Sequence, residues 1–488
     1  MPPADSETGL RGHLGVSGIV FLVLAAVAPL TGIIVIGGIG IAVGTGGGTP
    51  VMFLIATVVF LLFAVGYAQM ARHLVNAGGF YAYVVRGLGR TAGLVAAFVA
   101  MVGYNCFVAG AVGTSGFFTS TVMSGVFGLD APWWSWSLLS VAGAWALTRA
   151  GIDFSAKVLG VALVCEVAIL LVLDAAVLLR TGFSFEVFRP EVFLTGSLGL
   201  GLLFAANAFV GFEATGLFSE EARDPRRTVP RATYVAITFI GVFAAVTTWA
   251  IVSALGVREA GGIAAAHLDA GDLVFTVSAE HLGTALTDVM QLLLVVSLFA
   301  ALLALHNAAV RYLYALGRVG VLPRPLARTR RANGSPAVAS TAQLVLATAV
   351  AMAYAVAGAD PMTSLVASFT GIGTLGIIVL QAIAASAIVV HFRRARDPRW
   401  GRTFALPLLG GAGLWTVTVL AFVNFPELAG SENPVVTALP WLLPVAAVLA
   451  IGAAALFRAR KPHIWNALEQ DLDAVGLKPA ETTEGTPR

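Results

Sequence analysis

Long apolar stretches recur along the whole chain, separated by short polar segments. A helix needs about 20 apolar residues to cross the hydrocarbon core of a bilayer, and its backbone hydrogen bonds are then satisfied internally. We predict twelve helical spans, at residues 16–43, 50–71, 91–127, 132–148, 153–179, 195–217, 232–256, 283–316, 337–358, 362–391, 403–424 and 437–457. The pattern therefore predicts an all-α, polytopic membrane bundle over residues 16–458, with polar tails at 1–15 and 459–488.

The composition indicates that most of the protein surface faces lipid and not water. Of 488 residues, 58% are hydrophobic and 11% are charged, whereas soluble domains carry about 25% charged residues. Both cysteines, Cys106 and Cys165, lie inside apolar runs, which argues against a disulfide framework or a thiolate metal site.

The basic residues gather on one side of the predicted bundle. With both termini placed in the cytoplasm, only Arg180, Arg189 and Arg258 of the 29 basic residues fall in outer loops. This is the positive-inside pattern, and it predicts an even number of spans in the cell membrane. The net charge of +3 is explained by these loops, so we expect the lipid bilayer as a partner and no nucleic acid.

Two spans are interrupted near their middles. The first contains Pro29 and Gly32, and the sixth contains Gly211 and Gly216 on either side of a carboxylate. Proline removes a backbone donor and glycine frees the backbone, and paired interruptions in two halves of a bundle are typical of a transporter's central site. The alternative is a pair of ordinary kinks with close packing at glycine. The break residues that we expect to contact a substrate are Ala28, Pro29, Leu30, Thr31, Gly32, Asn207, Gly211 and Glu213.

Ionisable side chains also fall inside the spans. Glu166 lies near the middle of the fifth span and Glu213 in the sixth, where a charge costs about 2.5–3.5 kcal/mol on insertion scales. We therefore expect Glu166 to carry a coupling proton or bind a cation. The alternative is a protonated glutamic acid that is bonded to a neighbouring helix. Asp174, further along the same span, is a weaker candidate.

One histidine lies in the middle of the eighth span. His306 is a candidate for lining the pathway, although a single histidine is more often a packing residue. No second histidine or cysteine accompanies it at metal-ligand spacing, so we predict no metal site and no cofactor.

Three motifs resemble the amino acid–polyamine–organocation permeases. The most specific joins Gly211-Phe212-Glu213 to the stretch from Ser219 to Ala232, which reads SEEARDPRRTVPRA. The others are Asn76 to Tyr83, similar to the first cytoplasmic loop, and Arg311 to Pro323, similar to the end of the eighth helix. Together they cover most of the membrane domain.

The resemblance implies a five-plus-five inverted repeat of the leucine-transporter type with two further C-terminal helices. It implies alternating access around a site between the first, third, sixth and eighth helices. Tyr104 and Asn105 of the third span are therefore further residues that we expect to bind the substrate. It further implies a secondary transporter and not an enzyme.

The sequence departs from the family at three places. Relatives that bind α-amino acids commonly have Gly-x-Gly in the first helix, where this chain has Pro29-Leu30-Thr31-Gly32. Proton-coupled relatives have a lysine where this chain has Glu166. The aromatic gate of some relatives falls at Asn207, which leaves Phe209 as the nearer cover for a substrate.

Two acids near one site favour a cationic amine, or a neutral zwitterion moved with a proton. Our first interpretation is a proton-coupled importer of amino acids or related amines. A polyamine or organic-amine importer or exchanger, and a membrane sensor without transport, remain as alternatives. The sequence lacks the continuous polar lining that a channel needs. It also lacks the pairing of a nucleophile with a base that an enzyme needs.

Overall fold

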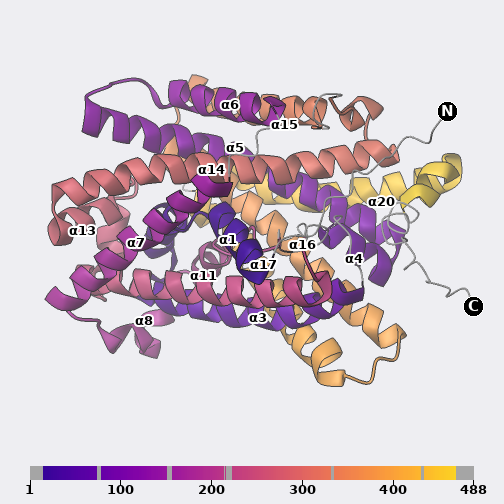
Figure 1. Ribbon diagram of the computed structural model, residues 1–488, viewed down its shortest axis with the longest axis horizontal. Coiled ribbons are helices and arrows are strands. Elements are labelled where there is room, and N and C mark those ends of the chain that lie inside the picture. The colour runs from indigo at the N-terminus through magenta and orange to yellow at the C-terminus, as the bar shows by residue number, and fades with distance from the viewer. Residues whose placement is uncertain are drawn as a thin grey trace, which may run out of the picture.

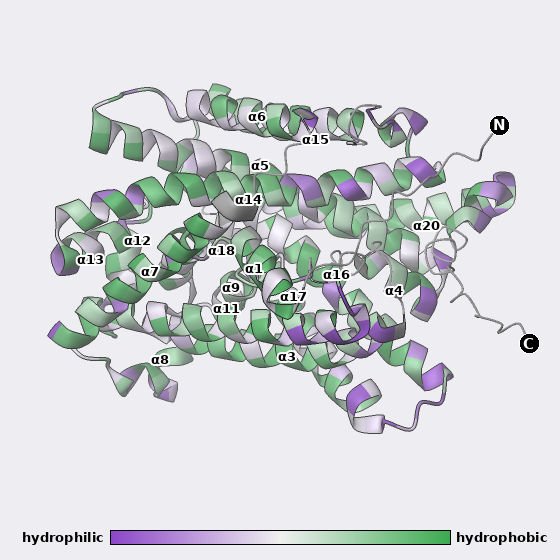
Figure 2. Ribbon diagram, viewed as in Figure 1, coloured by the Kyte–Doolittle hydropathy of each residue, from purple (hydrophilic) through white to green (hydrophobic). Residues whose placement is uncertain are grey.

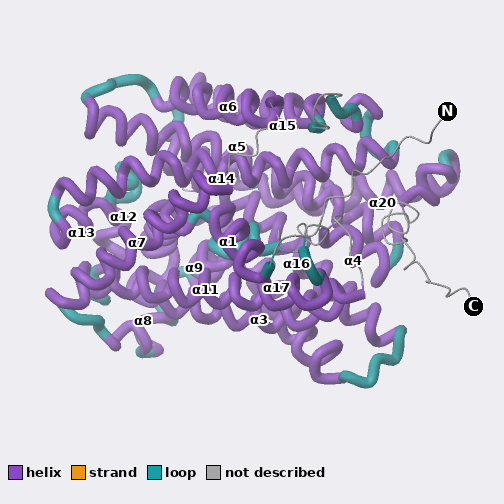
Figure 3. Tube along the Cα trace, viewed as in Figure 1, coloured by secondary structure: helices purple, strands orange, loops and turns teal. Residues whose placement is uncertain are grey.

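The structure is a computed structural model that describes residues 15–73, 79–150, 156–213, 215, 222–330, 335–429 and 434–468. Within these residues the regular elements are helices, and no β-strand is present (Figure 3). The predicted tails lie outside the described residues, except for Gly15 and the start of the C-terminal tail up to Leu468.

In the described part of the chain, ten long helices form the body, and many of them run along the longest axis of the molecule (Figure 1). They are α3 (Thr49–His73), α5 (Arg90–Phe127), α6 (Trp133–Ala150), α7 (Ala156–Arg180), α11 (Pro225–Leu255), α14 (Thr284–Val319), α15 (Ala337–Val356), α16 (Ala367–Arg394), α17 (Leu406–Val423) and α20 (Leu442–Arg460). Hydrophobic residues cover most of their length, and hydrophilic residues gather towards helix ends and loops (Figure 2). This distribution suits helices whose sides face lipid and whose ends face water.

Shorter elements connect or extend these helices. They are α1 (Val16–Val27), α2 (Pro29–Thr31), η1 (Gly32–Gly37), η2 (Gly40–Thr45), η3 (Gly46–Gly48), α4 (Gly79–Leu88), η4 (Phe185–Phe188), α8 (Pro190–Phe193), α9 (Leu198–Asn207), α12 (Ala260–Ala266), α13 (Leu273–Leu282), η5 (Arg324–Ala327), η6 (Pro361–Val366), η7 (Gly401–Ala405), α18 (Phe425–Ala429), α19 (Pro434–Thr437) and η8 (Leu439–Trp441).

Each of the twelve predicted spans overlaps a described helix. Among the described residues, nine helical stretches are long and apolar enough to cross a membrane. One of them, Pro29–Arg72, joins the second half of the first predicted span to the second span, and the others correspond to the third, fifth and seventh to twelfth spans. The first and sixth are interrupted, and α6, the predicted fourth span, carries tryptophans and serines that lower its hydropathy. The all-helical prediction is confirmed, with a multi-pass arrangement.

The first span breaks where the sequence predicts. Helix α1 ends at Val27, and Ala28 adopts a left-handed backbone with φ of 52°. Pro29 then occupies the first position of α2, where its missing N–H is not needed by the helix. The chain continues in the wider π-helical turns of η1 and η2.

The sixth span breaks after α9. That helix ends at Asn207, and the chain passes through turns as far as Glu213. Gly211 has φ of 109°, a conformation that side-chain-bearing residues rarely adopt. Gly216, the other glycine predicted for this break, lies outside the described residues.

Close glycine contacts join α5 to α16 behind these breaks. A Cβ added to Gly373 would lie 2.6 Å from the Cα of Phe107, and one added to Gly376 would lie 2.6 Å from the Cα of Gly103. Small residues let the two backbones approach in this way, which is a common mode of packing in membranes. The contact fixes α5 closely against α16.

Candidate functional site

Both helix breaks contribute lining residues to one cavity of about 70 Å³. The first break contributes Thr31 and Gly32, and the end of α9 contributes Asn207. Helices α5 and α16 add the hydroxyl groups of Thr114 and Thr370, and α14 adds aliphatic side chains. The described lining residues include none that is ionisable. The cavity is therefore mainly apolar, with a few hydroxyl groups and one amide.

Glu166 of α7 is bonded to the first break. Its Oε2 accepts a hydrogen bond from the backbone N–H of Leu30 at 3.2 Å, and its side chain is 3% exposed. The Ser297 hydroxyl of α14 also bonds to this carboxyl group. Thr31 in turn donates to Ser297 at 2.9 Å. The carboxyl group thus occupies the place that an anion would take at the start of the second half-helix, where backbone N–H groups are unsatisfied.

Glu213 is bonded within the second break. Its Oε1 accepts the hydroxyl of Tyr104 from α5, and its Oε2 accepts the backbone N–H of Gly211 at 2.9 Å. The Tyr67 hydroxyl donates to the backbone oxygen of Glu213 at 3.4 Å. The ring of Tyr104 stacks on Tyr312 of α14, with centroids 5.3 Å apart.

Neither carboxyl group lines the cavity. Glu166 and Glu213 both point to donors of the protein itself, so the acidic pathway that we expected is not formed in this conformation. A buried carboxyl group is stabilised by such donors, which explains why both turn inward. Glu166 bonds to elements on two other parts of the chain, α2 and α14, and its protonation state stays a prediction.

The two predicted asparagines have different positions. Asn207 lines the cavity, and its amide nitrogen donates to the hydroxyl of Thr374 on α16. Asn105 does not line it: its amide nitrogen donates to the Met101 carbonyl of its own helix at 2.7 Å. The Asn105 Oδ1 is buried and has no hydrogen-bond partner among the described residues.

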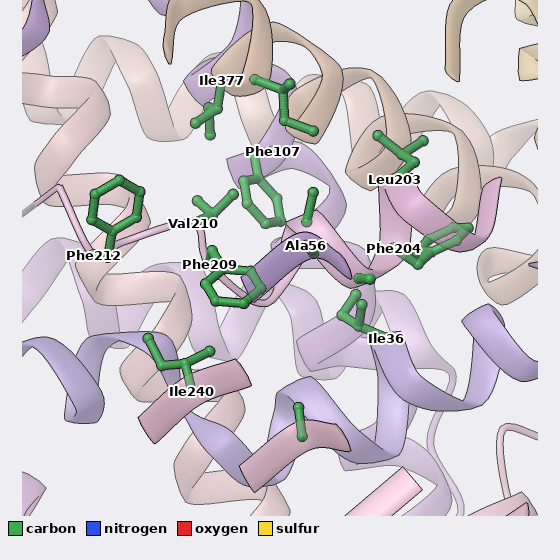
Figure 4. Packing of buried hydrophobic residues seen from close by; sticks show 14 of the residues in the cluster. Ile36, Ala56, Phe107, Leu203, Phe204, Phe209, Val210, Phe212, Ile240 and Ile377 are labelled. Carbon is green, nitrogen blue, oxygen red and sulfur yellow. The ribbon is translucent and has the colours of Figure 1, made fainter. Parts of the chain in front are cut away.

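Phe209 and His306 are not among the described residues that line the cavity. Phe209 is fully buried and stacks on Phe60 of α3 at 4.6 Å, among the packed apolar residues of Figure 4. The Nδ1 of His306 is 2.5 Å from Gln343 Oε1, and its Nε2 is 2.9 Å from the Ser340 hydroxyl. Both partners belong to α15, so His306 has the contacts of a satisfied packing histidine.

The remaining predicted residues of the two breaks contribute to the site through their backbones. Ala28 is buried at the turn, Pro29 begins α2, Leu30 is fully buried and supplies the N–H to Glu166, and Gly211 supplies the N–H to Glu213. They shape the site through the backbone and do not line the cavity.

Sequence reasoning missed the hydroxyl partners. Ser297 and Thr374 each lie in an apolar run with no motif around them, and nothing in the sequence marks them. Asp174 also has a partner of this kind, because its Oδ2 accepts from Thr247 of α11 at 2.9 Å. Its Oδ1 is buried with no partner among the described residues.

No group of three metal-binding side chains occurs in the part of the chain that the structure describes.

Two interrupted helices that line one cavity inside a multi-pass helical bundle are typical of a membrane transporter. The family model for amino acid permeases matches residues 14–452, and the chain belongs to that family. The resemblance to the amino acid–polyamine–organocation permeases is therefore confirmed.

Named relatives cover most of the chain. The branched-chain amino acid permease BcaP of Bacillus subtilis is 24% identical over 435 residues, which is 84% of this chain and 87% of the relative. A methylthioribose transporter of the same organism is 24% identical over 435 residues, covering 80% and 86%. The lysine-specific permease LysP of Lactococcus lactis is 25% identical over 372 residues, covering 71% and 68%. All three relatives are named as permeases or transporters, in agreement with the family.

Proposed function

We propose that the chain is a proton-coupled secondary transporter that imports a neutral amino acid across the cell membrane by alternating access. The observation that carries this proposal is the position of both helix breaks on one cavity that α5 and α14 also line. Paired discontinuous helices of this kind provide a binding site that rigid-body movement can expose to either side.

The twelve spans divide into two groups that each begin with a broken helix. The first group runs from α1 to α7, the second from α9 to α16, and α17 and α20 follow. We assign these groups to an inverted five-plus-five repeat with two added helices. The arginine-rich ends and both termini face the cytoplasm in this arrangement, following the distribution of basic residues.

The cavity lining favours a substrate with an apolar side chain. Val35, Ile36 and Leu298 supply aliphatic surface, while Asn207 and Thr31 supply hydrogen-bonding groups for a polar main chain. The printed name of one relative specifies branched-chain amino acids. A polyamine or lysine needs an acid at the site, and both nearby acids are occupied by internal donors. The lysine-specific relative makes lysine the second candidate to test.

The cavity must enlarge during the cycle. Its volume of about 70 Å³ lies far below the roughly 300–1,000 Å³ that encloses typical small-molecule ligands. This conformation is therefore too narrow at this point to hold an amino acid. Tyr104 and Glu213 join α5 to the second break on the side of the arginine-rich segment, and we assign them to closure of the inner side.

Glu166 is the proposed coupling group. An ionised carboxylate there accepts from Leu30 and Ser297 and is attracted to the positive end of the second half-helix. A proton removes this attraction and turns one oxygen into a donor. The proton content of Glu166 thus changes how firmly α7 and α14 hold the first break, which links protonation to the movement of that break.

A binding experiment with a cavity-filling variant tests the site. The purified protein is screened by thermal unfolding with valine, isoleucine, leucine, lysine and putrescine, because a ligand that binds only the folded state raises the midpoint. Ala301→Phe places a ring in the cavity, whereas Val296→Phe places one on an exposed part of the same helix. We expect an aliphatic amino acid to stabilise the wild type and Val296→Phe but not Ala301→Phe. Equal stabilisation of both variants would exclude this cavity as the site.

A further inference from the structure

Four arginines converge on an open pocket at one end of α3 and α11. Arg72 lies in the last turn of α3, and Arg226, Arg227 and Arg231 lie in the first two turns of α11. The pocket measures about 560 Å³, and the described residues that line it are these four. It is separate from the central cavity, and no described residue lines both.

Among the described residues, little negative charge lies against the four arginines of this pocket. Arg227 is 3.7 Å from Asp224, a pair in which both side chains are at least half exposed. An ion pair so exposed contributes little. Among the described residues, Arg72, Arg226 and Arg231 make no ion pair. Four like charges around one space repel each other, and an anion between them removes that repulsion.

Arginine chemistry favours a phosphate group as this anion. The planar guanidinium group donates parallel hydrogen bonds that match phosphate oxygens, and it is always charged. Basic pockets between membrane helices on the cytoplasmic side are known to suit anionic lipid headgroups.

The face of α11 beyond the pocket indicates that the phosphate belongs to a lipid. Arg227, Arg231 and Val235 follow at intervals of four residues, so they lie along one face of the helix. Val242 continues this face a further seven residues along. Val235 is 49% exposed and Val242 is 46% exposed. A charged patch that continues into an exposed apolar strip matches a headgroup followed by its acyl chain.

We propose that this pocket binds the phosphate-bearing headgroup of an anionic phospholipid from the membrane leaflet at the arginine-rich ends. The headgroup contacts Arg72, Arg226, Arg227 and Arg231, and its acyl chain lies along Val235 and Val242. Bound lipid links the end of α3 to the start of α11 and stabilises the packing of these two helices. This site is additional to the proposed transport function and does not depend on it.

Lipid binding to the purified full chain tests the proposal. The delipidated protein in neutral detergent is titrated with phosphatidylglycerol or phosphatidylcholine, and bound lipid is counted by native mass spectrometry alongside the thermal midpoint. The double variant Arg226→Gln/Arg231→Gln is compared with Arg458→Gln/Arg460→Gln, which removes the same charge from exposed positions at the end of α20. We expect a loss of phosphatidylglycerol affinity of about tenfold or more in the first variant only.

Three results would overturn the assignment. Equal losses in both double variants would indicate general surface charge, and equal affinity for the two lipids would remove the requirement for an anion. Stabilisation by glycerol phosphate alone, at concentrations that match the lipid, would indicate a site for free phosphate. If the double variant does not fold, Arg72→Gln on α3 carries the same expectation against the same control.

Discussion

Tyr104 and Tyr312 stack on each other beside the second helix break, yet only one of them bonds to it. The Tyr104 hydroxyl donates to the Glu213 carboxyl group. The Tyr312 ring provides a packing surface, and no hydrogen bond of its hydroxyl is found among the described residues. At the scale of single residues, the site is therefore held by a small number of specific polar contacts inside an apolar surrounding.

This difference predicts unequal effects of two matched substitutions. Tyr104→Phe leaves one oxygen of buried Glu213 without its donor, which costs about 1–3 kcal/mol. Tyr312→Phe removes a hydroxyl group and keeps the stacked ring. We expect a clear drop in the thermal midpoint for Tyr104→Phe and little change for Tyr312→Phe. Similar midpoints for the two variants would show that the Tyr104–Glu213 bond does not stabilise the fold.

The sequence predicts which residues are chemically unusual but not which atoms they contact. Glu166 and Glu213 stand out because they are acids inside apolar runs. Their partners come from other elements: Leu30 lies 136 positions from Glu166, and Tyr104 lies 109 positions from Glu213. Such contacts depend on the packing of whole helices. The sequence predicts an acidic pathway, whereas in the structure both carboxyl groups bond to donors of the protein itself.

At the scale of elements, the two breaks follow from local chemistry. Pro29 cannot continue α1 and Gly211 permits a positive φ, so both interruptions are visible in the sequence. The close approach of α5 and α16 is not visible, because its glycines become informative only when the two helices are seen in contact. The positions of breaks are thus local properties, whereas the cavity between them is not.

Gly211 provides a direct test of the second break. A side chain at its φ of 109° is strained by about 1–3 kcal/mol. Gly211→Ala should therefore lower the thermal midpoint and the activity together. Gly38→Ala is the control, because Gly38 has a helical φ of −59° and an added Cβ there meets nothing within 4 Å. If both substitutions are tolerated equally, the second break does not have the geometry described.

At the scale of the whole molecule, the alternation of apolar runs and basic loops predicts the helical bundle well. Each predicted span overlaps a helix because burial in lipid requires length and apolarity, and both are properties of a continuous segment. The size of the central cavity and the convergence of four arginines on one pocket could not be predicted. Both depend on the relative positions of helices that are far apart in the sequence.

Uptake into proteoliposomes under an imposed pH gradient tests the central claim, a proton-coupled carrier of amino acids. With an acidic exterior, we predict that the wild type accumulates a labelled aliphatic amino acid above its outside concentration and that a protonophore abolishes the accumulation. Glu166→Gln should still exchange internal for external substrate but should not accumulate it, while Cys165→Ala, an exposed neighbour on the same helix, behaves as wild type. Absence of gradient-stimulated accumulation of any amino acid or amine by the wild type would contradict the account.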